Sequence, residues 1–150
     1  MHQVRSRSKS RRARTLAVLA LAAARAGRAG AGPRARAHGS KTVAGEAKAP
    51  SLHKTVLPNT KGHTLYTLTG EINGKFICTG SCLKLWPPLL VAAGTKPAGP
   101  VKLGTIKRPE GKIQVTFKGM PVYTYAGDSR KGEANGEGLR DVGVWHAVTP

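Results

Sequence analysis

Two stretches of the chain decide its fold: residues 61–71 read KGHTLYTLTGE, and residues 118–128 read KGMPVYTYAGD. When they are aligned at an offset of 57, five of the eleven positions are identical and two more are close exchanges. Each stretch is followed by a tryptophan, Trp86 in the first case and Trp145 in the second. Similarity at a fixed spacing indicates a repeated structural unit. The sequence therefore predicts two copies of one supersecondary unit, related by a pseudo-twofold axis and sharing one core.

Both stretches begin with a Lys-Gly turn and then alternate as a strand does. In the first, Leu65 and Thr67 point to one face while Tyr66 and Leu68 point to the other, following the period of two that side chains have along a strand. Further short strands are expected at 76–77, 103–107, 112–117 and 144–148, with a turn at 108–111 and one helix at 81–85 that two prolines end. The predicted fold is mainly β, a small antiparallel domain with at most one short helix.

The first 37 residues have the composition of a leader. They hold ten of the 25 Lys and Arg and no acidic residue, and a ten-residue apolar run interrupts them. A basic stretch, a short apolar run and small residues are the three parts of a secretory signal peptide. We expect cleavage near Ala24 or Ala37, and Arg11-Arg12 resembles a twin-arginine export signal. A basic arm that binds nucleic acid is the alternative, which the apolar run disfavours.

Composition also divides the rest of the chain, whose total of 150 residues allows one ordinary domain or two very small ones. Residues 38–51 are rich in Gly, Ala, Lys and Pro and show no apolar periodicity, which predicts a flexible linker. The folded domain is then expected over residues 52–150. Its first repeat would cover about residues 55–91 and its second about residues 112–150.

Tyr123, Tyr125 and Asp128 stand in the pattern Y-x-[FWY]-x-x-D. This pattern resembles the signature of a family of secreted repeats of unknown function, described as predicted lipoproteins. Residues 78–89 look like the family's first repeat and residues 143–146 like the end of its second, so the resemblance covers about residues 55–148. It implies no known activity.

The chain departs from that family's pattern in two places. The first repeat has Leu68 and Glu71 where the signature has an aromatic residue and Asp. No cysteine follows the apolar run of the leader, so the resemblance implies a freely secreted or wall-associated member without a lipid anchor.

Cys78 and Cys82 are the only cysteines of the chain. In an exported protein such a pair normally oxidises. The C-x-x-C spacing of redox motifs and the C-x-x-C-H spacing of covalent haem attachment are both missing. We therefore expect a structural disulfide, with a labile disulfide or a metal thiolate as the alternative.

Five aromatic residues are candidate binding residues: Tyr66, Trp86, Tyr123, Tyr125 and Trp145. Tyrosine and tryptophan usually pack in a core, with the hydroxyl or indole N–H group bonded to a partner. The alternative is an exposed platform, supplied once by each repeat, that stacks on a sugar ring, a haem or a quinone.

Glu71 and Asp128 occupy matching positions after the strand of each repeat. Carboxylates there usually accept hydrogen bonds from backbone N–H groups of the following turn. The alternatives are the acid and base of a hydrolase, or ligands of a cation.

Metal binding stays open on the sequence alone. Residues 128–137 alternate oxygen-bearing side chains without the order of a calcium loop. His63 and His146 would have to join Asp128 to hold a transition metal, although scattered histidines are more often ordinary surface residues. No cofactor is predicted.

Charge supplies the leading hypothesis about function. Beyond residue 37 the chain has fifteen Lys and Arg against seven acidic residues, a net charge of +8, which attracts anionic partners. We expect a secreted or cell-surface module without enzymatic activity that binds an anionic or aromatic extracellular partner as a monomer. No nucleic-acid partner is expected, because the chain has no nucleic-acid-binding motif. An anionic cell-wall polymer or a membrane surface would fit. A redox, cofactor-carrying or metal-carrying accessory protein is the alternative, and a hydrolase is a third.

Overall fold

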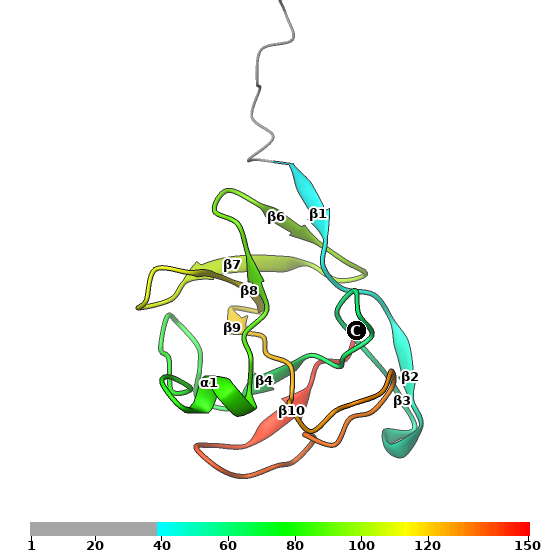
Figure 1. The fold of residues 1–150 in the computed structure, drawn as a ribbon. Helices are drawn as coiled ribbons and strands as arrows, with labels where there is room; N and C mark the ends of the chain where they lie inside the picture. The colour runs from blue at the N-terminus through cyan, green and yellow to red at the C-terminus, as the bar shows by residue number, and fades with distance from the viewer. Residues whose placement is uncertain (1–38) are drawn as a thin grey trace, which may run out of the picture. The chain divides into compact units, whose positions relative to one another are not determined.

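The computed structural model describes residues 39–150, so the signal peptide predicted for residues 1–37 lies outside the described residues. Short strands dominate this part of the chain, with one 3-10 turn and one short helix (Figure 1). The elements are β1 (Ser40–Thr42), β2 (Ala47–Ala49), η2 (Pro50–Leu52), β3 (Lys54–Val56), β4 (Tyr66–Leu68), α1 (Cys82–Leu85), β5 (Leu90–Val91), β6 (Lys96–Ala98), β7 (Leu103–Lys107), β8 (Ile113–Phe117), β9 (Met120–Pro121) and β10 (Trp145–Ala147). The prediction of a mainly β fold with one short helix is confirmed.

The strands form several small sheets. In the largest, β7 pairs antiparallel with all five residues of β8 along one edge, and β5 and β9 pair antiparallel with the two ends of the other edge. Strand β10 lies antiparallel beside β4 (Figure 1), and β2 pairs antiparallel with β3. One pair differs from the expected antiparallel arrangement, because β1 runs parallel to β6. More than 50 residues connect these two strands, and a connection of that length leaves the direction of pairing free.

The flexible linker predicted for residues 38–51 is wrong for the described part. Strands β1 and β2 and the turn η2 fall within it. Val43 donates its N–H group to Ala98 O at 2.9 Å, and Gly45 donates to Pro58 O at 3.0 Å. Val43 and Ala44 are buried in a core cluster. The residues that these small side chains contact lie far away in the sequence. The local composition of residues 38–51 therefore does not indicate that this segment is folded.

The strand expected at residues 76–77 is also absent from the described structure, where Phe76 and Ile77 lie in a loop. The backbone N–H group of Ile77 donates to Glu71 Oε2 at 3.0 Å. The carboxylate of Glu71 thus accepts the backbone hydrogen bond that the carbonyl group of a neighbouring strand would otherwise accept. In the second repeat the strand is shorter than expected, because only an isolated bridge at Tyr123 follows β9.

The two repeats meet at equivalent residues. Tyr66 and Tyr123 correspond at the offset of 57, and they form an antiparallel bridge with each other. Tyr66 N donates to Tyr123 O at 2.8 Å, and Tyr123 N donates to Tyr66 O at 2.9 Å. A reciprocal pair between equivalent residues is the contact that a local twofold axis produces. This contact agrees with the pseudo-twofold relation, which stays a prediction for the rest of the two repeats.

The alternation along residues 65–68 directs side chains into two different buried clusters, rather than into the single shared core that we expected. Leu65 and Val122, which are equivalent in the two repeats, pack in one cluster. Their neighbours Tyr66 and Tyr123 pack in the other, which is largely aromatic. Both faces of the repeat strand are covered, so a period of two sends successive side chains into different interiors.

The short helix and the disulfide lie next to the aromatic cluster. Helix α1 begins at Cys82 and is followed by Trp86, whose N–H group donates to Cys82 O at 2.9 Å. Cys78 and Cys82 form the expected disulfide, with their Cα atoms 5.3 Å apart. Within residues 39–150, no helix has the length and apolar character needed to cross a membrane.

Candidate functional site

The five candidate aromatic residues meet in one cluster. The rings of Trp86 and Trp145 are stacked, with centroids 3.7 Å apart and planes inclined by 9°. Tyr66 lies edge-on to Trp86 at 5.5 Å, and Tyr123 lies edge-on to Trp145 at 5.2 Å. Each repeat thus supplies one edge-on tyrosine–tryptophan pair. Tyr125 stacks on the outer side of the group, 4.5 Å from Trp86.

Burial decides what this cluster can do. Tyr66, Trp86, Tyr123 and Trp145 have no solvent-exposed surface, and Tyr125 is half-buried. These four rings cannot present the exposed stacking platform that was the alternative prediction. Their arrangement matches the core packing that aromatic residues usually adopt.

Each tyrosine hydroxyl group reaches the carboxylate of the other repeat. Tyr66 donates to Asp128 Oδ2 at 2.5 Å, and Tyr123 donates to Glu71 Oε2 at 3.0 Å. Each carboxylate also accepts a backbone N–H group from the loop that follows it, from Asn135 to Asp128 Oδ1 at 2.9 Å and from Ile77 to Glu71. The expected role of these carboxylates in holding the next turn is confirmed. The hydrogen bonds from each tyrosine to the carboxylate of the other repeat were not predicted.

This environment perturbs all four groups. Burial raises the pKa of Glu71 and the pKa of Asp128 above their ordinary values. Burial, reinforced by the neighbouring carboxylates, raises the pKa of Tyr66 and the pKa of Tyr123. Glu71 has no exposed surface and Asp128 is 4 % exposed. Both carboxylates are therefore closed off from an external substrate.

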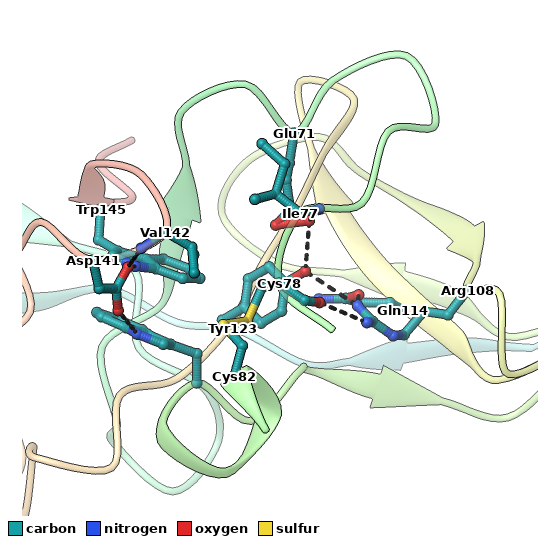
Figure 2. The surroundings of a disulfide bond; sticks show 11 residues. Glu71, Ile77, Cys78, Cys82, Arg108, Gln114, Tyr123, Asp141, Val142 and Trp145 are labelled. Carbon is teal, nitrogen blue, oxygen red and sulfur yellow. Dashed lines mark hydrogen bonds between the residues drawn. A yellow bond between two sulfur atoms is a disulfide. The ribbon is translucent and has the colours of Figure 1, made fainter. Parts of the chain in front are cut away.

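Asp141, which the sequence analysis missed, joins the two tryptophans. Trp86 Nε1 donates to Asp141 Oδ2 at 2.8 Å. Trp145 Nε1 donates to Asp141 Oδ1 at 2.7 Å (Figure 2). One carboxylate thus satisfies both buried indole groups. No local signal marks this residue, because the role depends on two tryptophans that come from different repeats.

Arg108, expected only as part of the turn at residues 108–111, is the second missed residue. It is 1 % exposed and forms an ion pair with Glu110. Its Nη1 atom donates to Gln114 Oε1 at 2.6 Å and to the Tyr123 hydroxyl group at 3.1 Å, and Nη2 donates to Cys78 O at 3.0 Å (Figure 2). The guanidinium group therefore ties the β7–β8 turn to the disulfide loop and the second tyrosine.

The remaining candidates are separate from this cluster. His146 lies 3.3 Å from Glu137, and Glu133 accepts the backbone N–H groups of Ser129 and Arg130. The oxygens of residues 128–137 thus hold their own loop. Among residues 39–150, no group of three His, Cys, Asp or Glu side chains is placed to hold a metal ion, so His63, His146 and Asp128 are not brought together.

Acidic and basic residues are used differently. Six of the seven acidic side chains accept hydrogen bonds from the protein itself: Glu71, Glu110, Asp128, Glu133, Glu137 and Asp141. Of the fifteen Lys and Arg in residues 39–150, only Arg108 forms an ion pair with a described acidic residue. The other fourteen are exposed: Lys41, Lys48, Lys54, Lys61, Lys75, Lys84, Lys96, Lys102, Lys107, Lys112, Lys118, Arg130, Lys131 and Arg140. Most acidic side chains therefore have a hydrogen-bond partner within the protein, whereas the fourteen exposed Lys and Arg have no acidic partner among the described residues.

Comparison with known proteins adds one match. A family model described as "Secreted repeat of unknown function" matches residues 104–149, which run from β7 to the end of β10 and contain Tyr123, Asp128 and Trp145. No curated protein and no solved structure matches the chain.

Proposed function

We propose that this chain, whose residues 104–149 match the model of a family of secreted repeats of unknown function, is an exported module without enzymatic activity that binds an anionic polymer at the cell surface. The observation that carries the proposal is the excess of exposed Lys and Arg without an acidic partner among residues 39–150. Fourteen exposed cations face solvent, whereas six of seven acidic side chains are bonded within the protein.

Such a surface attracts polyanions by long-range electrostatics. The summed field of many like charges raises the local concentration of an opposite charge and speeds its encounter. The positive charge has few internal partners to neutralise it, since Arg108 is the one described Lys or Arg that is paired with an acid. The family's description as secreted, together with the leader pattern of residues 1–37, supports a place outside the cell.

The burial of the carboxylates supports the absence of hydrolysis. A general acid or base must come within about 3 Å of the substrate group with which it exchanges a proton. Glu71 and Asp128 are enclosed and already accept bonds from tyrosines and loop N–H groups. We therefore assign both carboxylates a structural role and assign binding to the exposed surface.

Retention on phosphocellulose tests the proposal. The folded protein should be retained at low salt and released as NaCl rises, because salt screens exposed charges. Two controls are needed, uncharged cellulose and the same protein after lysine acetylation, which removes the charge of each modified side chain. Neither control should show retention. Retention that does not change with salt would contradict the electrostatic proposal. Retention of the acetylated protein equal to that of the unmodified protein would contradict it as well.

A further inference from the structure

The five aromatic rings of the candidate site form a path from the surface into the interior. Tyr125, which is half-buried, stacks on Trp86 with the ring centroids 4.5 Å apart. Trp86 stacks on Trp145 at 3.7 Å, and Tyr123 lies edge-on to Trp145 at 5.2 Å. Tyr66 branches from this path, edge-on to Trp86 at 5.5 Å. Tyrosine and tryptophan are the aromatic side chains that lose an electron most readily, so every ring of the path is oxidisable.

The hydrogen bonds made by the buried rings differ from those of an ordinary core. Most side-chain hydrogen bonds in proteins go to backbone groups or water, and only about 10–15 % of all internal hydrogen bonds join two side chains. Here the buried hydroxyl and indole groups all donate to carboxylates: Tyr66 to Asp128, Tyr123 to Glu71, and Trp86 and Trp145 to Asp141. Figure 2 shows the contacts of Tyr123 and Trp145. A carboxylate is therefore within hydrogen-bond distance of each buried oxidisable group.

The carboxylates beside the two tyrosines have a property that a backbone carbonyl group lacks. Glu71 has no exposed surface and Asp128 is 4 % exposed, and burying a carboxylate costs more free energy than burying a carbonyl group. Either group can accept a hydrogen bond, but only a carboxylate can also take the proton. Oxidised tyrosine is a strong acid that releases its hydroxyl proton at once. An acceptor at 2.5 Å from Tyr66 and at 3.0 Å from Tyr123 therefore lets the electron and the proton leave together.

We propose that the aromatic cluster is a one-electron relay, which passes an oxidising equivalent from its half-buried end at Tyr125 through the stacked tryptophans to Tyr66 or Tyr123. The oxidant is a one-electron acceptor, such as an oxygen-centred organic radical, that takes one electron and becomes an anion. The buried tyrosine that supplies this electron gives its hydroxyl proton to the carboxylate already bonded to it. The products are a neutral tyrosyl radical and a carboxylic acid, and no bond between heavy atoms forms or breaks.

Burial does not prevent this chemistry. A substrate must touch an acid or base, whereas an electron passes between rings in van der Waals contact, so only Tyr125 has to be within reach of the oxidant. The relay is independent of the binding proposed above, because it uses no exposed Lys or Arg. Return of one electron, for example from a thiolate that becomes a thiyl radical, brings the proton back to the hydroxyl group and restores the starting state.

Flash photolysis tests the relay. Photogenerated tris(bipyridine)ruthenium(III) is the oxidant, and transient absorption and electron paramagnetic resonance distinguish tryptophan radicals from tyrosyl radicals. In the wild-type protein a tryptophan radical should form first and decay as a tyrosyl radical grows. Tyr66→Phe and Tyr123→Phe should each lose part of the tyrosyl signal. A tyrosyl signal unchanged in both variants would place the radical on Tyr125, the one other tyrosine of the chain, and would overturn the relay.

A second comparison tests the proton acceptors. The double variant Glu71→Gln/Asp128→Asn keeps an oxygen to accept each hydroxyl group but cannot take its proton. The tryptophan radical should therefore live longer and the tyrosyl signal should fall. Glu110→Gln, which neutralises a carboxylate outside the aromatic cluster, should behave like the wild-type protein. Equal tyrosyl yields in the double variant and in Glu110→Gln would overturn the relay even if a phenylalanine variant fails to fold. Thermal unfolding confirms that each variant compared is folded.

Discussion

Tyr66 and Tyr123 join the two repeats through the same interactions made in opposite directions. Their backbones exchange two hydrogen bonds, of 2.8 and 2.9 Å. The hydroxyl group of each then crosses to a carboxylate of the other repeat, Tyr66 to Asp128 and Tyr123 to Glu71. The tyrosine and the carboxylate of each repeat thus find their hydrogen-bond partners in the other repeat.

Removing either hydroxyl group should therefore destabilise the domain. We expect Tyr66→Phe and Tyr123→Phe each to lower the free energy of unfolding by about 1–3 kcal/mol, because a buried carboxylate loses its donor. Tyr125→Phe is the matched control, on a half-buried ring outside the exchange, and should cost less than about 0.5 kcal/mol. Urea unfolding measures all three. Equal losses in the three variants would contradict the role of the exchange.

Arg108 should be needed for stability although it lies in a turn. Arg108→Met leaves Gln114 Oε1 and Cys78 O without their donor, and we expect a loss of about 3 kcal/mol in thermal or urea unfolding. Arg108→Lys should recover only part of this, since one ammonium group cannot reproduce the planar fork. Glu110→Gln, which changes only the more exposed partner of the ion pair, should cost at most about 1 kcal/mol. A loss from Glu110→Gln as large as that from Arg108→Met would show that the ion pair, rather than the buried bonds, matters.

Asp141 should control the environment of the stacked tryptophans. Asp141→Asn leaves a single side-chain oxygen for two indole N–H groups, so one buried donor loses its partner at a cost of about 1–3 kcal/mol. Tryptophan fluorescence and near-ultraviolet circular dichroism should change with it. Glu46→Gln, which also neutralises one exposed acid, should leave both spectra unchanged. Wild-type spectra and stability in Asp141→Asn would exclude the shared carboxylate as a stabilising contact.

Buried and exposed carboxylates should give opposite pH dependence. Burial raises the pKa of Glu71, so the folded state holds the proton more tightly than the unfolded state, and stability falls as pH rises above about 4. Glu71→Gln should therefore gain stability relative to the wild-type protein as pH rises.

Glu110 provides the opposite control. The hydrogen bond from Arg108 lowers the pKa of Glu110, so its contribution to stability is present above the ordinary carboxyl pKa and is lost as pH falls through the lowered value. Relative to the wild-type protein, Glu110→Gln should be less stable at neutral pH and should approach it in acid. Unfolding measured from pH 3 to pH 8 distinguishes the two slopes. The same sign for both variants would contradict the assignment.

Local features of the sequence predicted the local features of the structure. The alternation of Ile113, Val115 and Phe117 predicted β8, and the prolines after Leu85 predicted the end of α1. The disulfide between Cys78 and Cys82 followed from their number and the expected export. In each case the residues that decide the outcome are neighbours in the chain, so the pattern contains the information.

By itself, then, the sequence determined the β class and the disulfide. Only the tertiary structure decided that Tyr66 meets Asp128 across 62 positions and that Trp86 meets Asp141 across 55, or that Val43 and Ala44 are buried rather than part of a linker. The physical reason is that a hydrogen bond depends on distance in space. Residue type limits which partners a group can accept, whereas the folded chain decides which of them comes within about 3 Å.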